Sequence, residues 1–227
     1  MSFTAFMREL HGVRVEGELI KTISYSLLTG IITLAVLYVF RLKSIEKVTD
    51  TYGFFLLLAV CSYALLSVAI HQVRAYREMP CMAGMMVGMT IGMIAGFLPG
   101  FYVASTNGMF VGSVFGMVIG ICLGIWNGRC CGVMGVMEGV MAGFMGGLMG
   151  AMTAFMLLND NLRAAAVIVF LISALILISL NYMIYKEMRE IKTRPNKEHL
   201  FAIAFTFIMT VITIWLMVFG PRSTLFG

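Results

Sequence analysis

The sequence predicts an all-α integral membrane protein with about seven transmembrane helices, and three observations lead to this prediction. The 227 residues are 60% hydrophobic and 12% charged, with a mean hydropathy of +0.96, whereas soluble domains are about a quarter charged. Seven apolar stretches, each long enough to cross a bilayer, are separated by short polar loops. Glycine recurs at every fourth position from Gly84 to Gly132, interrupted at Ala104. Because residues four apart share one face of a helix, this spacing predicts a glycine-zipper inner bundle.

The expected spans cover roughly 22–40, 52–70, 81–98, 108–126, 132–158, 163–185 and 200–219. Between the third and fourth spans, Pro99-Gly100 and Thr106-Asn107 are typical of a loop. The chain is therefore one polytopic membrane domain, 1–227, with a Gly/Met-rich core at 79–158. Spans three to five are expected to form the inner bundle. The other four lack the glycine pattern, and we expect them to surround it and face lipid.

The distribution of basic residues predicts the orientation. The N-terminus and the second, fourth and sixth loops carry 11 Lys and Arg residues, and the opposite side carries 5. The amino terminus is therefore expected to be cytoplasmic, in a protein of the cell membrane. The net charge of +5 lies in these loops, so we expect contact with lipid headgroups and no nucleic-acid partner.

The glycines expected to pack helices together lie in spans three, four and five. They are Gly84, Gly88, Gly92, Gly108, Gly112, Gly116, Gly120, Gly124, Gly139, Gly143 and Gly147. Small residues at this spacing let helix backbones approach closely in a membrane.

Methionines form a second ladder, and 15 of the 21 lie in 79–156. In span five they are four residues apart and lie opposite the glycines of the same helix. In span three the corresponding set is close to the glycines. The candidate thioether ligands are Met82, Met85, Met89, Met93, Met137, Met141, Met145 and Met149. Thioethers are neutral soft ligands that suit Cu(I) or another soft metal ion. The alternative interpretation is that methionine fills gaps left by glycine.

Three of the five cysteines, Cys81, Cys130 and Cys131, are expected at the cytoplasmic side, where reduced thiols can bind a soft metal. The odd number and the positions resemble no disulfide framework. Alternatively, cysteine serves here as a small residue that suits close packing.

Glu138 is the acidic residue inside a predicted span. A carboxylate at membrane depth usually faces a cavity, a partner or a permeating ion. Glu138 is therefore a candidate proton acceptor or cation ligand. The alternative is a protonated carboxyl, or one paired with Arg129, that has a structural role.

Two short patterns resemble those of known metal transporters. Met85, Met89 and Met93, followed by Gly112, Gly116, Gly120 and Gly124, are similar to the pattern of Ctr-type copper transporters. The vicinal pair Cys130-Cys131 at the end of a span is similar to that of mercuric-ion transport proteins. Ctr proteins have three spans, so the resemblance bears on metal chemistry and not on the fold.

The leading hypothesis is a membrane protein that transports or sequesters a soft metal ion, with Cu(I) as the leading candidate. The ion would follow a path lined by methionines that ends at the cytoplasmic cysteines. One alternative is a non-enzymatic structural or assembly subunit that binds further copies or other membrane subunits through its glycine stripes. Another is an ion channel or proton-coupled carrier that uses Glu138. No H-E-x-x-H, G-x-S-x-G or Walker-type motif occurs, so we do not expect an enzyme.

Overall fold

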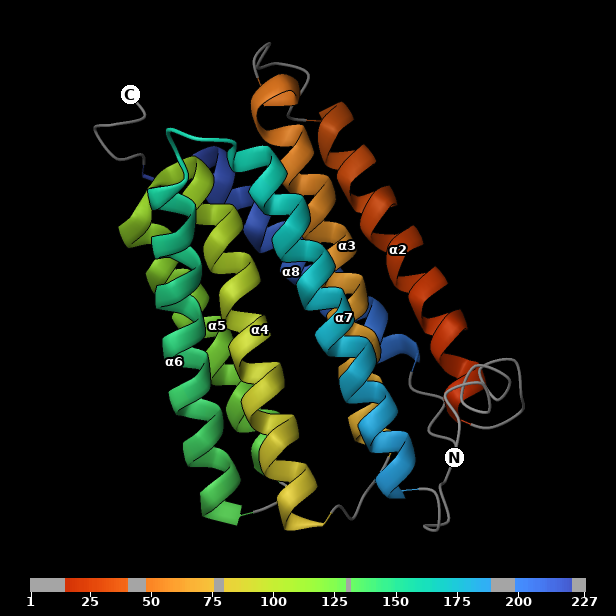
Figure 1. Ribbon diagram of the computed structural model, residues 1–227. Helices are drawn as coiled ribbons and strands as arrows, with labels where there is room; N and C mark the ends of the chain where they lie inside the picture. Colours follow the sequence, from red (N-terminus) through yellow and green to blue (C-terminus); the bar gives the residue numbers. More distant parts are fainter. Residues whose placement is uncertain (1–14, 41–47, 76–79, 130–131, 189–198, 222–227) are drawn as a thin grey trace.

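The computed structural model describes residues 15–40, 48–75, 80–129, 132–188 and 199–221, and within these ranges it is all-helical (Figure 1). The helices are α2 (Val15–Phe40), α3 (Val48–Ala75), α4 (Cys81–Asn107), α5 (Met109–Gly128), α6 (Gly132–Met156), α7 (Leu162–Met188) and α8 (His199–Phe219). The last six are long and apolar enough to cross a membrane. The described apolar part of α2 is shorter and covers Lys21–Val36. The predicted all-α membrane fold is confirmed.

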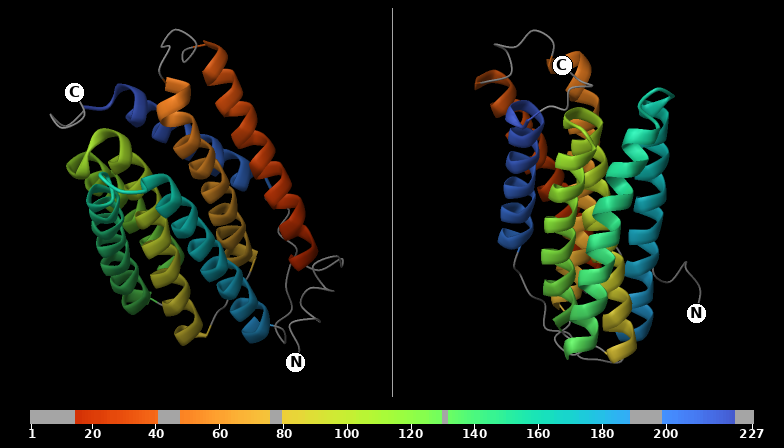
Figure 2. Two further views of the ribbon diagram at one scale, coloured as in Figure 1. Left: turned by 45° about the horizontal axis from the view of Figure 1, so that its top comes forward. Right: turned by 90° about the vertical axis from the view of Figure 1, so that its left-hand side faces the viewer.

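The helices form two groups that lie side by side (Figures 1 and 2). The glycine bundle consists of α4, α5 and α6, and the α3 group consists of α2, α3, α7 and α8. Of the six long spans, α3 is the most enclosed, with 72% of its apolar window buried, compared with 44% for α6. The expectation that span two belongs to a lipid-facing surround is therefore wrong. The glycine bundle occupies one side of the molecule, and α4 connects it to α3.

In the glycine bundle, helix backbones lie in direct contact. Helices α4 and α6 run from the Cys81 end of the molecule to the Gly108 end, and α5 runs back. A Cβ atom added to Gly120 would lie 2.8 Å from Cα of Gly96 and 2.9 Å from Cα of Gly143. Four such levels follow one another along the bundle: Gly88, Gly128 and Gly135; Gly92, Gly124 and Gly139; Gly96, Gly120 and Gly143; Gly100, Gly116 and Gly147. The axis of the bundle is therefore occupied by backbone.

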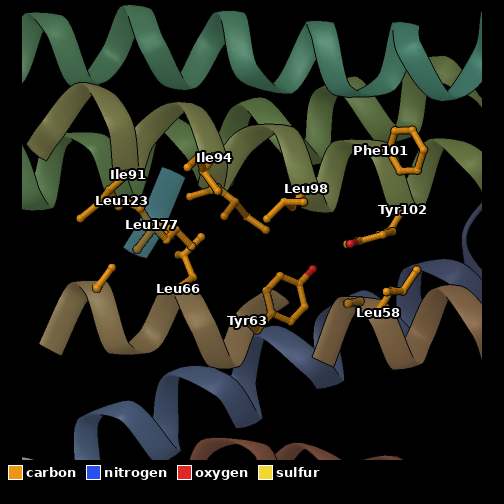
Figure 3. Close-up of a cluster of buried hydrophobic side chains, with 14 of the residues drawn as sticks. Leu58, Tyr63, Leu66, Ile91, Ile94, Leu98, Phe101, Tyr102, Leu123 and Leu177 are labelled. Carbon is orange, nitrogen blue, oxygen red and sulfur yellow. The ribbon is translucent and has the colours of Figure 1, made fainter. Parts of the chain in front are cut away.

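The opposite face of α4 carries large side chains. Ile91, Leu98 and Tyr102 are fully buried there. They pack between α3 and α7, where Leu66 and Leu177 meet them (Figure 3). This core holds the glycine bundle against the α3 group.

Helix α4 extends beyond its predicted end. It passes through Pro99 and ends at Asn107, so the expected loop between spans three and four is reduced to Gly108, which has φ of 112°. The extension is stable because residues 98–107 are all buried, and in a membrane an unpaired backbone group is more costly than a proline in a helix. The Asn107 amide donates a hydrogen bond to the carbonyl of Leu216 at 2.7 Å, which ties the turn to α8.

The backbone contacts predict the effect of a single methyl group. Gly120→Ala should lower the free energy of unfolding by about 1–3 kcal/mol, because the added Cβ meets two helix backbones that cannot move aside independently. Thermal unfolding in detergent measures the change.

Gly53→Ala in α3 is the control for this substitution. No atom lies within 4 Å of its added Cβ, and alanine favours the helix by up to about 1 kcal/mol. Equal thermal stability of the Gly120→Ala variant and the wild type would contradict the close packing.

Candidate functional site

The methionines of α6 lie on the outer surface of the glycine bundle. Met137, Met141, Met145 and Met149 have exposed fractions of 60%, 62%, 57% and 54%. Gly139, Gly143 and Gly147, on the opposite side of the helix, are buried. The two sets diverge because both repeat every four residues and are offset by half a turn. The gaps at the glycines are filled by the backbone of neighbouring helices of the same chain, and these four methionines lie outside them.

The methionines of α4 emerge along its contact with α6. Met82, Met86, Met89 and Met93 are exposed, and Met85 is half-buried. A Cβ atom on Gly146 would touch the backbone of Met93, and one on Gly150 would touch the backbone of Phe97. Two rows with a period of four therefore run side by side along the two helices.

The register of these rows places Glu138 among the α4 methionines. From the contact of Gly146 with Met93, one step of four residues toward the Cys81 end pairs Ala142 with Met89. A second step pairs Glu138 with Met85. Glu138 and Met85 are both half-buried, as expected at a seam between two helices. We refer to Met85, Met89 and Glu138, which this register places along the contact between α4 and α6, as the α4–α6 seam.

Within the described ranges, no side chain forms an ion pair or hydrogen bond with Glu138. Arg129, the partner considered from the sequence, is exposed at the end of α5 and does not pair with it.

The cysteines are spread over several helices. Cys81 is exposed at the first residue of α4, next to Met82, and Cys122 is exposed on α5. Cys61 is half-buried on α3. Cys130 and Cys131 lie outside the described residues, so their part in the predicted cluster is not placed. Among the residues that the structure describes, no three His, Cys, Asp or Glu side chains come together.

Three of the glycines predicted to pack helices lie outside the four backbone levels. Gly108 is the turn between α4 and α5 and belongs to neither helix. Gly112 approaches Ala104 of α4, where the glycine spacing is interrupted. Gly84 is buried near the start of α4. The remaining ones take part in the four backbone levels described above.

Sequence reasoning missed the polar side chains on α3. His71 lies just beyond the span expected at 52–70, but α3 continues to Ala75 and His71 is buried inside it. Tyr63, Ser67 and His71 are four residues apart, which is the signal that could have revealed a polar face.

Comparison with known protein families, curated proteins and solved structures finds no match to this chain.

Proposed function

We propose that this protein binds a soft monovalent metal ion at the α4–α6 seam, and that it transports or sequesters this ion in the membrane. Cu(I) is the leading candidate. The observation that carries the proposal is the register of α4 and α6, in which Glu138 is level with Met85 and lies one turn of helix from the level of Met89. The α6 ladder of Met137, Met141, Met145 and Met149 extends the set of thioethers along the same helix.

The composition of the exposed faces supports a chemical role for these methionines. The exposed face of α7 consists of branched aliphatic residues such as Ile168, Leu171 and Leu175. Those of α4 and α6 consist largely of methionine. All these faces suit lipid equally well on hydrophobicity, so contact with lipid does not explain why α4 and α6 differ from α7. Thioether sulfur provides a soft ligand that leucine lacks.

The charge at the seam supports a monovalent cation. Thioethers are neutral, so they leave the charge of a bound ion uncompensated in a medium of low dielectric constant. One carboxylate, that of Glu138, balances one positive charge. The pair formed by the ion and the carboxylate would then be neutral, which lowers the cost of holding either group at membrane depth.

The cysteines would bind the metal ion where it enters or leaves the methionine-lined path. Cys81 lies one turn from Met85 on α4, and we propose that it receives or delivers the ion together with Cys130 and Cys131. The excess of Lys and Arg at this end supports a cytoplasmic location for it and for the amino terminus.

Replacing the seam thioethers should weaken metal binding without unfolding the protein. Met85→Leu combined with Met89→Leu keeps volume and hydrophobicity, so it should cost less than about 1.5 kcal/mol of stability. Binding of Ag(I), a stable analogue of Cu(I), should fall by about tenfold or more because the soft donors are gone. Titration of the detergent-purified protein with Ag(I) measures the affinity. Glu138→Gln should also weaken binding, and Met141→Leu with Met145→Leu tests the ladder.

Met217→Leu is the matched control, because Met217 is fully buried in α8, away from the seam. It should bind Ag(I) like the wild type. Equal Ag(I) affinity in the wild type and in all the seam and ladder variants would contradict the metal site and would favour the alternative of an assembly subunit.

The proposed orientation is tested by labelling single cysteines placed at the two ends. Asn159 in the loop between α6 and α7 and Arg129 at the end of α5 are both exposed, and they lie at opposite ends of the glycine bundle. In intact cells an impermeant maleimide should label Asn159→Cys and should label Arg129→Cys only after permeabilisation. The reverse pattern would contradict a cytoplasmic amino terminus.

A further inference from the structure

Two arginines and a tryptophan lie together at the Cys81 end of the molecule, and the proposed metal site does not use them. Arg74 is half-buried in the last turn of α3. Its guanidinium carbon lies 5.6 Å from the centre of the Trp126 ring, near the end of α5. Arg129 is exposed and continues the turn of α5 with φ of −60° and ψ of −24°, so it lies on the same side of the helix as Trp126. We call Arg74, Trp126 and Arg129 the arginine–tryptophan cluster.

The cluster joins two helices that do not pack together along their lengths. Helices α3 and α5 each pack against α4. At the Cys81 end Arg74 reaches across to α5, and the cation–π contact with the indole ring holds its guanidinium there. A contact that only joined the helices would need one arginine. Arg129 adds a second positive charge beside the same ring, and two like charges at this spacing create a positive potential that attracts an anion.

The charge of Arg129 is not balanced by the described part of the chain. Helix α5 contains no Asp or Glu. Among the residues that the structure describes, no acidic side chain forms an ion pair with Arg129, Glu138 of α6 included. An anion at this position would therefore supply a charge that the described helices do not provide.

Trp126 places the cluster at the level where lipid headgroups meet acyl chains. Tryptophan is enriched at this level because its ring is apolar and its N–H is polar. A guanidinium group carries five N–H donors in a planar fork, which suits the oxygens of a phosphate group. Basic sites between transmembrane helices bind phosphate-bearing lipid headgroups in this way. The chemistry of the cluster therefore suits a phosphate at the membrane surface.

The exposed side of α5 continues from the cluster as an apolar row. Phe110, Val114, Val118 and Cys122 are exposed and follow one another at intervals of four residues that lead to Trp126. The rise from Trp126 to Val114 is about 18 Å, and half of the hydrocarbon core measures about 15 Å. The two valines and the cysteine are smaller than the aromatic residues at the ends of the row. An acyl chain can lie along them while its headgroup stays at the arginines, whereas a free phosphate ion makes no use of this row.

We propose that the arginine–tryptophan cluster binds the phosphate of an anionic phospholipid, with one acyl chain along the apolar row of α5. Arg74 and Arg129 donate hydrogen bonds to the phosphate oxygens, and the ring of Trp126 lies against the upper part of the lipid. The bound lipid joins α3 to α5 where the two helices do not pack together. This site lies on α3 and α5 and is separate from the α4–α6 seam.

Fluorescence quenching by brominated lipids tests the site. The chain has two tryptophans, Trp126 and Trp215, and Trp215 lies in α8 near the opposite end of the molecule. In the Trp215→Phe protein, Trp126 is therefore the reporter. In mixed bilayers, phosphatidylglycerol with brominated acyl chains should quench Trp126 more strongly than brominated phosphatidylcholine at the same mole fraction. The relative affinity should favour phosphatidylglycerol by about fivefold or more, the factor that one arginine provides at an anionic headgroup.

Arg74→Gln combined with Arg129→Gln in the same background should abolish this preference. Lys186→Gln is the matched control, because it removes an exposed positive charge from α7 at the same end of the molecule. It should keep the preference. If the double variant does not purify as a folded protein, Arg129→Gln alone replaces it and should lower the preference.

Added inorganic phosphate distinguishes a lipid from a free anion. At constant ionic strength it should leave quenching by brominated phosphatidylglycerol unchanged, because a free ion gains nothing from the apolar row. Three results would overturn the proposal. They are equal affinity of the parent protein for the two lipids, an unchanged preference in the folded arginine variant, and loss of the preference when inorganic phosphate is added.

Discussion

Contact between helix backbones at the glycines of α4, α5 and α6 is the constraint on which the other features depend. Because these helices meet through Cα atoms and carbonyl groups, the bundle has no room for side chains along its axis. All large side chains of α5 and α6 must therefore point away from the axis. This places the methionine ladder outside, and it sets the register of α4 and α6 in which Glu138 is level with Met85. A pathway for an ion through the bundle axis would conflict with this packing.

Helix α4 combines two kinds of packing on its two sides. Toward α5 and α6 it presents glycine, and toward α3 and α7 it presents bulky residues such as Leu98 and Tyr102. The first side depends on close approach of backbones and the second on interlocking side chains and buried hydroxyl groups. The two groups of helices thus have different chemistry, with soft sulfur on one side of α4 and hydroxyl groups on the other.

The sequence allowed the fold to be predicted where its signals were periodic. Glycine at every fourth residue identified the three helices of the bundle, and apolar length located the spans within a few residues at most ends. The end of α4 was missed because Pro99-Gly100 is a turn signal in water, whereas burial in a membrane keeps the helix intact. The position of α3 was missed because enclosure depends on tertiary contacts that composition does not reveal. The level of Glu138 relative to Met85 depends on the register of two helices, which neither helix encodes alone.

Twelve methionines are exposed in the described part of the molecule, nearly all of them on α4 and α6. This feature makes the surface of the glycine bundle sensitive to oxidation. Lipid peroxides and hydrogen peroxide convert a thioether to a sulfoxide, which is polar and is a poor neighbour for acyl chains. A helix that begins as an apolar surface would gain a dipole at each oxidised position, and its preferred depth and tilt in the bilayer would change. Enzymatic reduction of the sulfoxides would restore the original surface. The fraction of oxidised methionines on the glycine bundle would therefore follow the oxidation state of the membrane.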